Sequence, residues 1–89
     1  MYEIEFTSRA NREFKKLTPA VQERLEDAID CLEDNPRQTG VKKLNRVLYR
    51  IRAGDWRIIF AILDKQQRVV IVKVARRSKD TYADLNKLF

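Results

Sequence analysis

Residues 48–60 read LYRIRAGDWRIIF, and this stretch decides the fold. Two short runs of strand-forming residues flank Gly54-Asp55, a pair typical of the tip of a β-hairpin. Every charged side chain on the two runs is an arginine, namely Arg50, Arg52 and Arg57. The solvent face of a strand needs only polar residues, so three arginines on one hairpin indicate a binding site for an anion.

The chain before this hairpin predicts one strand and two helices. Residues 2–6 alternate apolar and acidic side chains, as in a strand with one buried face. Two stretches with helical spacing of apolar residues follow, residues 8–16 and residues 19–34. A hydroxyl side chain precedes each stretch and can cap its helix, Thr7 or Ser8 for the first and Thr18 for the second. Together they predict a helical hairpin.

The rest of the chain predicts a loop, three strands and a short helix. The polar residues 37–46 are expected to form the loop, and the strands are expected at 47–53, 56–63 and 69–75. Residues 78–88 can form a terminal helix. The sequence therefore predicts an α+β fold of order β-α-α-β-β-β(-α), an antiparallel-rich sheet with the helical hairpin packed on one face. We expect residues 1–89 to form a single domain.

Side-chain alternation sorts the last three strands into a buried and an open face. The expected buried set is Tyr49, Ile51, Ile58, Phe60, Ile62, Val70, Val72 and Val74. The open face is then expected to carry Arg50, Arg52, Arg57 and Lys73 around a floor of Ile59, Ala61 and Ile71. The third of these strands is expected to end near Ala75, which frees Arg76 and Arg77 at its edge. Like charges on a ladder repel, and arginine matches phosphate oxygens with two parallel bonds, so this face suits phosphate.

Charge is distributed unevenly along the chain. Residues 1–35 hold 5 Lys/Arg and 9 Asp/Glu, whereas residues 36–89 hold 14 Lys/Arg and 4 Asp/Glu. This separation indicates a polyanionic partner, of which nucleic acid is the commonest, although a basic soluble surface is the simpler alternative. The predicted loop adds Lys42, Lys43 and Arg46 to the basic surface.

The residue types present exclude several kinds of chemistry. With no histidine, the chain lacks the usual acid–base group at neutral pH, the Ser-His and Cys-His nucleophile systems and most zinc sites. Few carboxylates lie in the basic half, which disfavours a two-metal nuclease site. Cys31, the one cysteine, is expected to be a small buried residue in a reducing compartment. Phosphate chemistry by positioning and charge remains.

The motifs resemble those of the RelE toxins of bacterial toxin–antitoxin pairs, within the RelE/ParE superfamily. The resemblance covers essentially the whole chain, including the strand, the helical hairpin and the short terminal helix. Its motifs are KL at 43–44, YRIR at 49–52, GDWRIIF at 54–60, VARR at 74–77 and Tyr82. The hairpin motif is specific to the superfamily rather than to its ribonuclease branch.

The resemblance implies cleavage of mRNA in the ribosomal A site by attack of the RNA 2′-hydroxyl group, without metal or cofactor. The family's catalytic positions fall on Arg50, Arg52, Arg57, Arg76 and Tyr82, with Arg57 as the arginine that stabilises the transition state. Contacts to RNA or the ribosome are expected from Lys42, Lys43, Arg46, Lys73 and Arg77.

At positions 50 and 52 some RelE members carry lysine, one of which can act as general base. Arg50 and Arg52 stay protonated and are poor bases. Either the two arginines act by charge alone, or the base is elsewhere, in Lys43 or in a ribosomal RNA group.

The resemblance also implies partners and a location. The expected partners are a cognate RelB-like antitoxin in a toxin–antitoxin hetero-oligomer, the ribosome and mRNA, with no membrane, in the cytoplasm. Two other functions stay open. One is ParE-like inhibition of DNA gyrase without catalysis, and the other is an inert relative that only binds antitoxin or nucleic acid.

Overall fold

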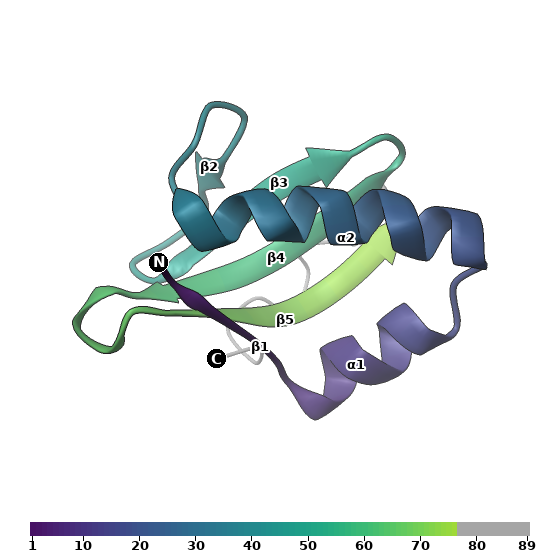
Figure 1. The fold of residues 1–89 in the computed structure, drawn as a ribbon, viewed down its shortest axis with the longest axis horizontal. Helices are drawn as coiled ribbons and strands as arrows, with labels where there is room; N and C mark the ends of the chain where they lie inside the picture. Colours follow the sequence, from purple (N-terminus) through teal and green to yellow (C-terminus); the bar gives the residue numbers. More distant parts are fainter. Residues whose placement is uncertain (77–89) are drawn as a thin grey trace.

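The computed structural model describes residues 1–76, and all structural statements below refer to that range. Its elements, drawn in Figure 1, are β1 (Glu3–Phe6), α1 (Ser8–Lys15), α2 (Pro19–Asp34), β2 (Lys42–Lys43), β3 (Leu48–Ala53), β4 (Trp56–Leu63) and β5 (Arg68–Arg76). A 3-10 turn at Asp64–Gln66 connects β4 to β5. The predicted helix at 78–88, Arg77 and Tyr82 lie outside the described residues.

Both helices begin where the sequence predicts. The Thr7 side chain accepts a hydrogen bond from the backbone N–H of Ala10 at 3.1 Å, and Thr18 accepts one from Val21 at 3.4 Å. Each hydroxyl satisfies a backbone donor that has no partner within its own helix. The missing N–H of Pro19 costs nothing in the first turn of α2.

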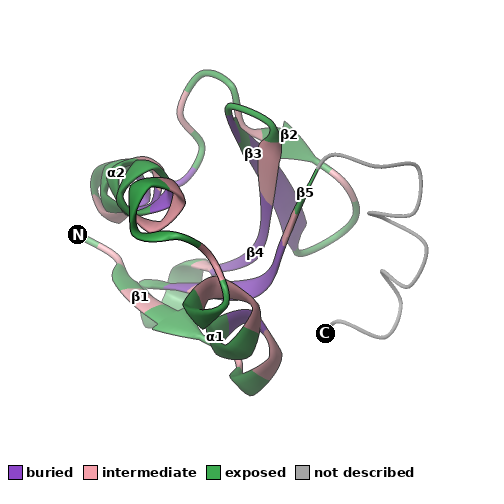
Figure 2. Ribbon diagram, turned by 90° about the vertical axis from the view of Figure 1, so that its right-hand side faces the viewer, coloured by how far each residue is buried: buried purple, intermediate pink, exposed green. Residues whose placement is uncertain are grey.

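The strands form one sheet of five in the order β1-β5-β4-β3-β2. β1 pairs with β5 in parallel, and the other three pairings are antiparallel. Figure 2 shows α1 and α2 on the same side of the sheet, with the buried residues concentrated on β3, β4 and β5. The predicted α+β fold with a helical hairpin on one sheet face is confirmed.

The main core lies between the sheet and the helices. α1 contributes Ala10, and α2 contributes Leu25, Ile29 and Leu32. The sheet contributes Tyr49, Ile51, Ala53, Ile58, Phe60, Ile62, Val69, Ile71 and Val74. The expected alternation is therefore confirmed along β3 and β4.

In β5 the expected alternation is wrong for its first half. Val69 and Ile71 belong to the main core, whereas Val72, with Val70 packed beside it, belongs to a second cluster on the opposite face. An irregularity in the β4–β5 ladder explains the difference: Ile59 pairs with Lys73, but its neighbour Phe60 pairs with Ile71. One extra residue on β5 reverses the faces on either side of it, and such a β-bulge leaves no mark in an alternating sequence.

Three further expectations are corrected. Residues 37–46 are not wholly a loop, because Lys42–Lys43 form the edge strand β2 on β3. β5 extends to Arg76 rather than ending near Ala75. Cys31 is exposed rather than buried. The buried stripe of α2 runs through Leu25, Ile29 and Leu32, and position 31 lies outside that stripe.

Candidate functional site

Strand pairing gathers cations on the sheet face opposite the helices. Arg52 on β3 lies directly across from Arg57 on β4, which in turn pairs with Ala75 on β5. In the next row, Lys42, Arg50, Ile59 and Lys73 follow one another across β2, β3, β4 and β5. Adjacent strands lie about 4.8 Å apart, so the register alone brings these five cations into one group.

The cations differ in their access to solvent. Arg52 is exposed, and Arg57 is half-buried with its Nε atom shielded from solvent. Arg50 and Lys73 are each only 8% exposed, although both were expected on an open face. The expected wet floor is in fact a second small core of Leu48, Ile59, Ala61 and Val72, with Leu44 and Val70 packed against it. Charges beside such an apolar cluster interact more strongly than charges in water.

The strands that carry this group differ from β1 in their acidic residues. No Asp or Glu occurs on β2, β3, β4 or β5. Ile4 packs on the main core, so Glu3 and Glu5 on β1 point to the same face as the cations, which the sequence reasoning did not foresee. β1 is at the far edge from β2, and the Glu5 carboxylate lies 3.4 Å from the Arg68 guanidinium. The face is therefore graded from mixed charge at β1 to purely basic at β3 and β2.

The three cations predicted around the loop are separated by β2. Lys42 pairs with Arg50 and joins the cation group, whereas Lys43 pairs with Tyr49, a residue of the main core. Side chains of neighbouring strand residues point to opposite faces, so Lys43 lies away from the group. Arg46 is exposed in the connection between β2 and β3.

The register also separates Arg76 from Arg57. Arg76 pairs with Trp56, and its guanidinium carbon lies 5.7 Å from the centre of the Trp56 ring, a cation–π contact. Trp56 packs against the main core, so this pair belongs to the helix side of the sheet. The structure therefore brings together Arg50, Arg52, Arg57, Lys42 and Lys73, and sets Arg76 on the other side of the strand end.

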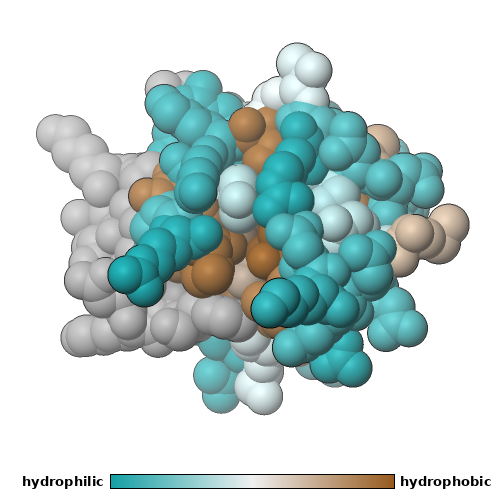
Figure 3. All heavy atoms as spheres, turned by 90° about the vertical axis from the view of Figure 1, so that its left-hand side faces the viewer, coloured by the Kyte–Doolittle hydropathy of each residue, from teal (hydrophilic) through white to brown (hydrophobic). Residues whose placement is uncertain are grey.

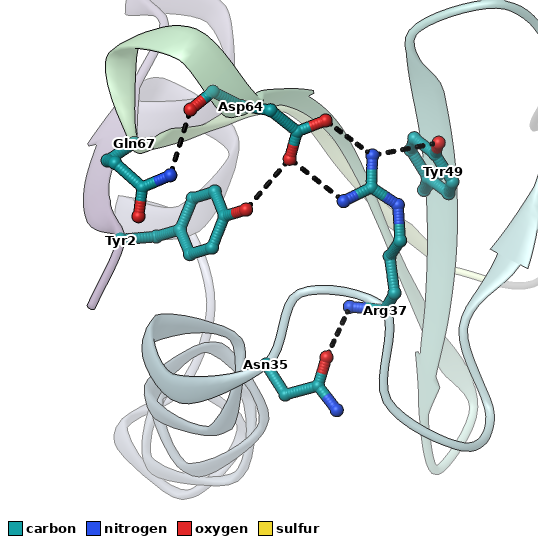
Figure 4. A network of polar contacts seen from close by, with 6 residues as sticks. All are labelled: Tyr2, Asn35, Arg37, Tyr49, Asp64 and Gln67. Atoms are coloured by element: carbon teal, nitrogen blue, oxygen red, sulfur yellow. Dashed lines mark hydrogen bonds and ion pairs between the residues drawn. The ribbon is translucent and has the colours of Figure 1, made fainter.

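The opposite end of the sheet, where β4 meets β5, holds a polar network (Figure 4). Arg37 donates two parallel hydrogen bonds to the Asp64 carboxylate, at 2.9 and 2.8 Å, and Tyr2 donates a third at 2.7 Å. These bonds, chiefly those from Arg37, lower the pKa of Asp64 from 3.8 to about 2. The hydrogen bond to Asp64 raises the pKa of Tyr2. Figure 3 shows this end as largely hydrophilic, with apolar side chains in a band between polar ones.

Sequence reasoning missed this network and one further contact. Arg37 and Asp64 are 27 residues apart, and nothing in the local sequence signals their pairing. The Glu13 carboxylate of α1 accepts a hydrogen bond from the backbone N–H of Val74 at 3.0 Å. This bond gives a partner to a backbone donor of β5 that lies beyond the end of β1. Both contacts depend on long-range packing and both stabilise the frame around the site.

Comparison with known proteins assigns the family. A family model described as the ParE toxin of the type II toxin–antitoxin system parDE matches residues 4–81. The chain belongs to the RelE/ParE toxin superfamily. It is accordingly a toxin of a type II toxin–antitoxin system, and the resemblance seen in the sequence is confirmed at this level.

Relatives named RelE extend the comparison within the superfamily. The chain is 32% identical to Toxin RelE of Mycobacterium tuberculosis over 80 residues, covering 86% of this chain and 82% of that protein. It is 33% identical to Toxin RelG of the same organism over 81 residues, covering 86% and 92%. A chain of the intact E. coli RelBE toxin–antitoxin complex superposes with a TM-score of 0.78 at 25% identity, over 89% of this chain and all of that one.

Two negative findings complete the description of this RelE/ParE superfamily member. Within residues 1–76, no helix is both long enough and apolar enough to cross a membrane. In the same range, no three His, Cys, Asp or Glu side chains are grouped as metal ligands would be.

Proposed function

We propose that this toxin is a metal-independent endoribonuclease that cleaves mRNA in the A site of the ribosome and so inhibits translation. The observation that carries the proposal is the opposed pair Arg52 and Arg57, beside Arg50 and Lys73, on strands without an acidic residue. Guanidinium groups match the geometry of phosphate oxygens, and their charge opposes the negative charge that develops on a phosphate during attack.

The proposed reaction uses the RNA's own nucleophile. The 2′-hydroxyl oxygen attacks the adjacent phosphorus and the bond from phosphorus to the 5′ oxygen breaks. The departing 5′ oxygen takes a proton from water, so a 2′,3′-cyclic phosphate and a 5′-hydroxyl group result. Arg57 stabilises the extra negative charge, and exposed Arg52 holds the phosphate in line. Arg50 and Lys73, being largely buried, contribute positive potential rather than the outermost contact. Arg76 and Tyr82 complete the set by resemblance to the family.

Proton transfer is assigned outside the arginines. A guanidinium group is a poor base, so the three arginines act by charge. Lys43, one of the candidate bases, pairs with Tyr49 rather than with Arg50. We therefore infer that a ribosomal RNA group takes the 2′ proton, which is also a reason for cleavage to depend on the ribosome.

We further infer that a RelB-like antitoxin binds and silences this protein in a hetero-oligomer in the cytoplasm. The solved chain with a TM-score of 0.78 comes from a toxin–antitoxin complex, which supports such a partner. The remaining cations of the basic half, Lys42, Lys43, Arg46 and Arg77, are proposed to contact RNA or the ribosome.

Expression of the protein without antitoxin tests the proposal in cells. We expect translation to stop and mRNA to be cut, and Arg57→Ala or Tyr82→Phe to restore growth while the protein stays folded. Variants as toxic as the parent would show that these residues do not carry the activity.

The second candidate is inhibition of DNA gyrase without catalysis, because the matching family model is described as a ParE toxin. Supercoiling of plasmid DNA and integrity of mRNA are then measured in the same cells. Loss of supercoiling with intact mRNA supports the gyrase inhibitor, whereas cut mRNA with normal supercoiling supports the ribonuclease.

A further inference from the structure

Arg24 on α2 is seated on the tip of the β3–β4 hairpin. Gly54 has a φ of +64°, and a Cβ placed on it would lie 2.7 Å from a terminal guanidinium nitrogen of Arg24. Glycine suits this position for two reasons: it allows the left-handed turn conformation, and it leaves room for the guanidinium. A helix residue from the acidic half of the chain is thereby held at the end of the basic sheet.

The Arg24 side chain is exposed and its charge is available. Within residues 1–76, no hydrogen bond or ion pair joins Arg24 to another residue, even though Asp55 is the next residue after Gly54. A structural arginine would be expected to neutralise a carboxylate or to bond a carbonyl group. The guanidinium instead lies against Gly54, on a residue that is exposed to solvent.

A second arginine lies at the same end and on the same side of the sheet. Ala53, Trp56 and Arg76 form one row across β3, β4 and β5, and Arg24 meets the hairpin next to Ala53. Two strand spacings, about 10 Å, separate the ends of this row. The Trp56 ring lies between these ends and carries the Arg76 guanidinium on its face.

Arg52 and Arg57 belong to the neighbouring row, on the opposite face. Figure 2 looks onto this end of the molecule, with α2 on one side of the strands. The strand end is therefore bordered by cations on both faces, two from β3 and β4 on one side and Arg24 with Arg76 on the other.

We propose that Arg24 forms a second phosphate-binding site, next to Trp56 and Arg76, which holds the backbone of an RNA strand that passes around the β3–β4 turn from the reacting phosphate. This inference rests on the proposed function and adds to it an RNA contact outside the catalytic residues. Arg24 is a positioning residue: it anchors RNA outside the reacting phosphate, so it acts on affinity and not on the chemical step.

Ribosomes programmed with an mRNA whose A-site nucleotides carry 2′-O-methyl groups provide the probe, because that modification removes the attacking hydroxyl. The affinity of the full chain is measured over a range of salt concentrations. We expect Arg24→Gln to bind about threefold to tenfold more weakly, with a salt dependence smaller by about one unit in the log–log slope. Arg24→Lys should retain most of the slope, since it keeps the charge.

The control is Arg12→Gln, which removes one positive charge from the exposed surface of α1. It should bind like the parent. On unmodified mRNA, the cleavage rate at saturating concentrations of Arg24→Gln should equal that of the parent within about twofold, because one remote contact changes affinity alone. Ribosomes without mRNA distinguish the source of the phosphate: weakening in both states indicates ribosomal RNA, and weakening only with mRNA indicates mRNA.

Equal affinity and slope for Arg24→Gln and Arg12→Gln would overturn the inference, as would weakened antitoxin binding with unchanged ribosome binding. A parent protein that binds programmed ribosomes but never cuts mRNA contradicts the proposed function instead. In that case the loss of affinity in Arg24→Gln still decides whether the second phosphate site exists. A parent that does not bind ribosomes at all overturns both.

Discussion

Arg57 is the residue on which the proposed chemistry depends. It lies in the middle of the three long strands, opposite Arg52 on one side and Ala75 on the other. Its Nε atom is shielded from solvent, while the residue as a whole is half-buried. A partly packed side chain loses less freedom on binding a phosphate than a fully exposed one, which favours stabilising a transition state by preorganised charge.

Replacing Arg57 with alanine should lower the rate of mRNA cleavage on ribosomes by about 10²- to 10³-fold, the usual effect of removing one preorganised donor from a transition state. Arg57→Lys should recover only part of this loss, because lysine lacks the planar fork. Single-turnover cleavage measures both effects, with circular dichroism as the test of folding. Arg12→Ala, on the exposed side of α1, should cleave like the parent.

Asp64 gives a prediction about stability and pH. Its pKa is about 2 in the folded protein against 3.8 ordinarily, so its ionised form stabilises the fold above about pH 4. This contribution should be lost as the pH falls from 4 to 2, where the carboxylate gains a proton and its bonds to Arg37 and Tyr2 weaken. Asp64→Asn should be less stable than the parent at neutral pH and should lose less stability over that acid range.

Urea unfolding at pH 6, 4, 3 and 2 measures the difference. Asp27→Asn, on an exposed turn of α2, removes a carboxylate without this network and should follow the parent curve. Identical acid sensitivity of Asp64→Asn and the parent would mean that the Arg37–Asp64 pair does not contribute to the fold.

At the scale of single residues, local patterns predicted much of the site. Alternation on β3 and β4 was sufficient to place Arg50, Arg52 and Arg57 on one face, because those strands are regular and their turn is short. Burial was not predictable, since the exposure of Arg50 depends on neighbours contributed by other strands. The contact of Arg24 with Gly54 depends on how α2 crosses the sheet, which no local pattern encodes.

Among the elements, β5 departs most clearly from the simple alternation that the sequence predicts. Its bulge turns Val69 and Ile71 to the helices and Val72 to the other face, while Val74 returns to the core. Because of the extra residue, Lys73 still pairs with Ile59 and reaches the cation group. The bulge thus lets one strand serve both the core and the site.

A pair of adjacent substitutions tests this arrangement. Val69→Lys should destabilise the protein by more than about 3 kcal/mol, because Val69 is fully buried in the main core and a lysine there would bury an unpaired charge. Val70→Lys, at a half-buried position, should cost about 1 kcal/mol or less. Chemical denaturation compares them, and the opposite ranking would restore the simple alternation and contradict the bulge.

The β3–β4 turn offers a second test at this scale. Gly54→Ala should destabilise the fold by about 1 kcal/mol, because alanine is strained at a φ of +64°. Gly54→Asn should cost less, because asparagine tolerates the left-handed conformation. Both add a Cβ against Arg24, so equal losses for the two in thermal unfolding would mean that crowding, and not backbone strain, dominates.

The elements themselves were predictable where their ends carry chemical signals. Thr7, Thr18 and Pro19 marked both helix starts, and Gly54 marked the hairpin. β2 was missed because two lysines after Val41 have no strand pattern of their own and pair only because β3 offers a free edge. Its place matters, since it brings Lys42 and not Lys43 opposite Arg50.

At the scale of the molecule, charge differs between the first elements of the chain and the last four strands. The helices and β1 belong to the part of the chain with 9 acidic and 5 basic residues, and β2 to β5 belong to the part with 14 basic and 4 acidic ones. The uneven charge distribution along the sequence therefore becomes a difference between the helices with β1 and the four strands β2 to β5. Such a field favours association with a polyanion in one orientation, with the sheet towards the RNA.

The central claim is that this sheet is a ribosome-dependent ribonuclease site, and mapping mRNA 5′ ends in a purified translation system tests it most directly. The protein is added with and without ribosomes, at the same Mg²⁺ concentration, so that the ribosomes stay assembled on mRNA. We expect new 5′ ends within A-site codons only when ribosomes are present, and none with Arg57→Ala. Intact mRNA on ribosomes bound by the folded protein, or cutting of free mRNA to the same extent, would contradict the account.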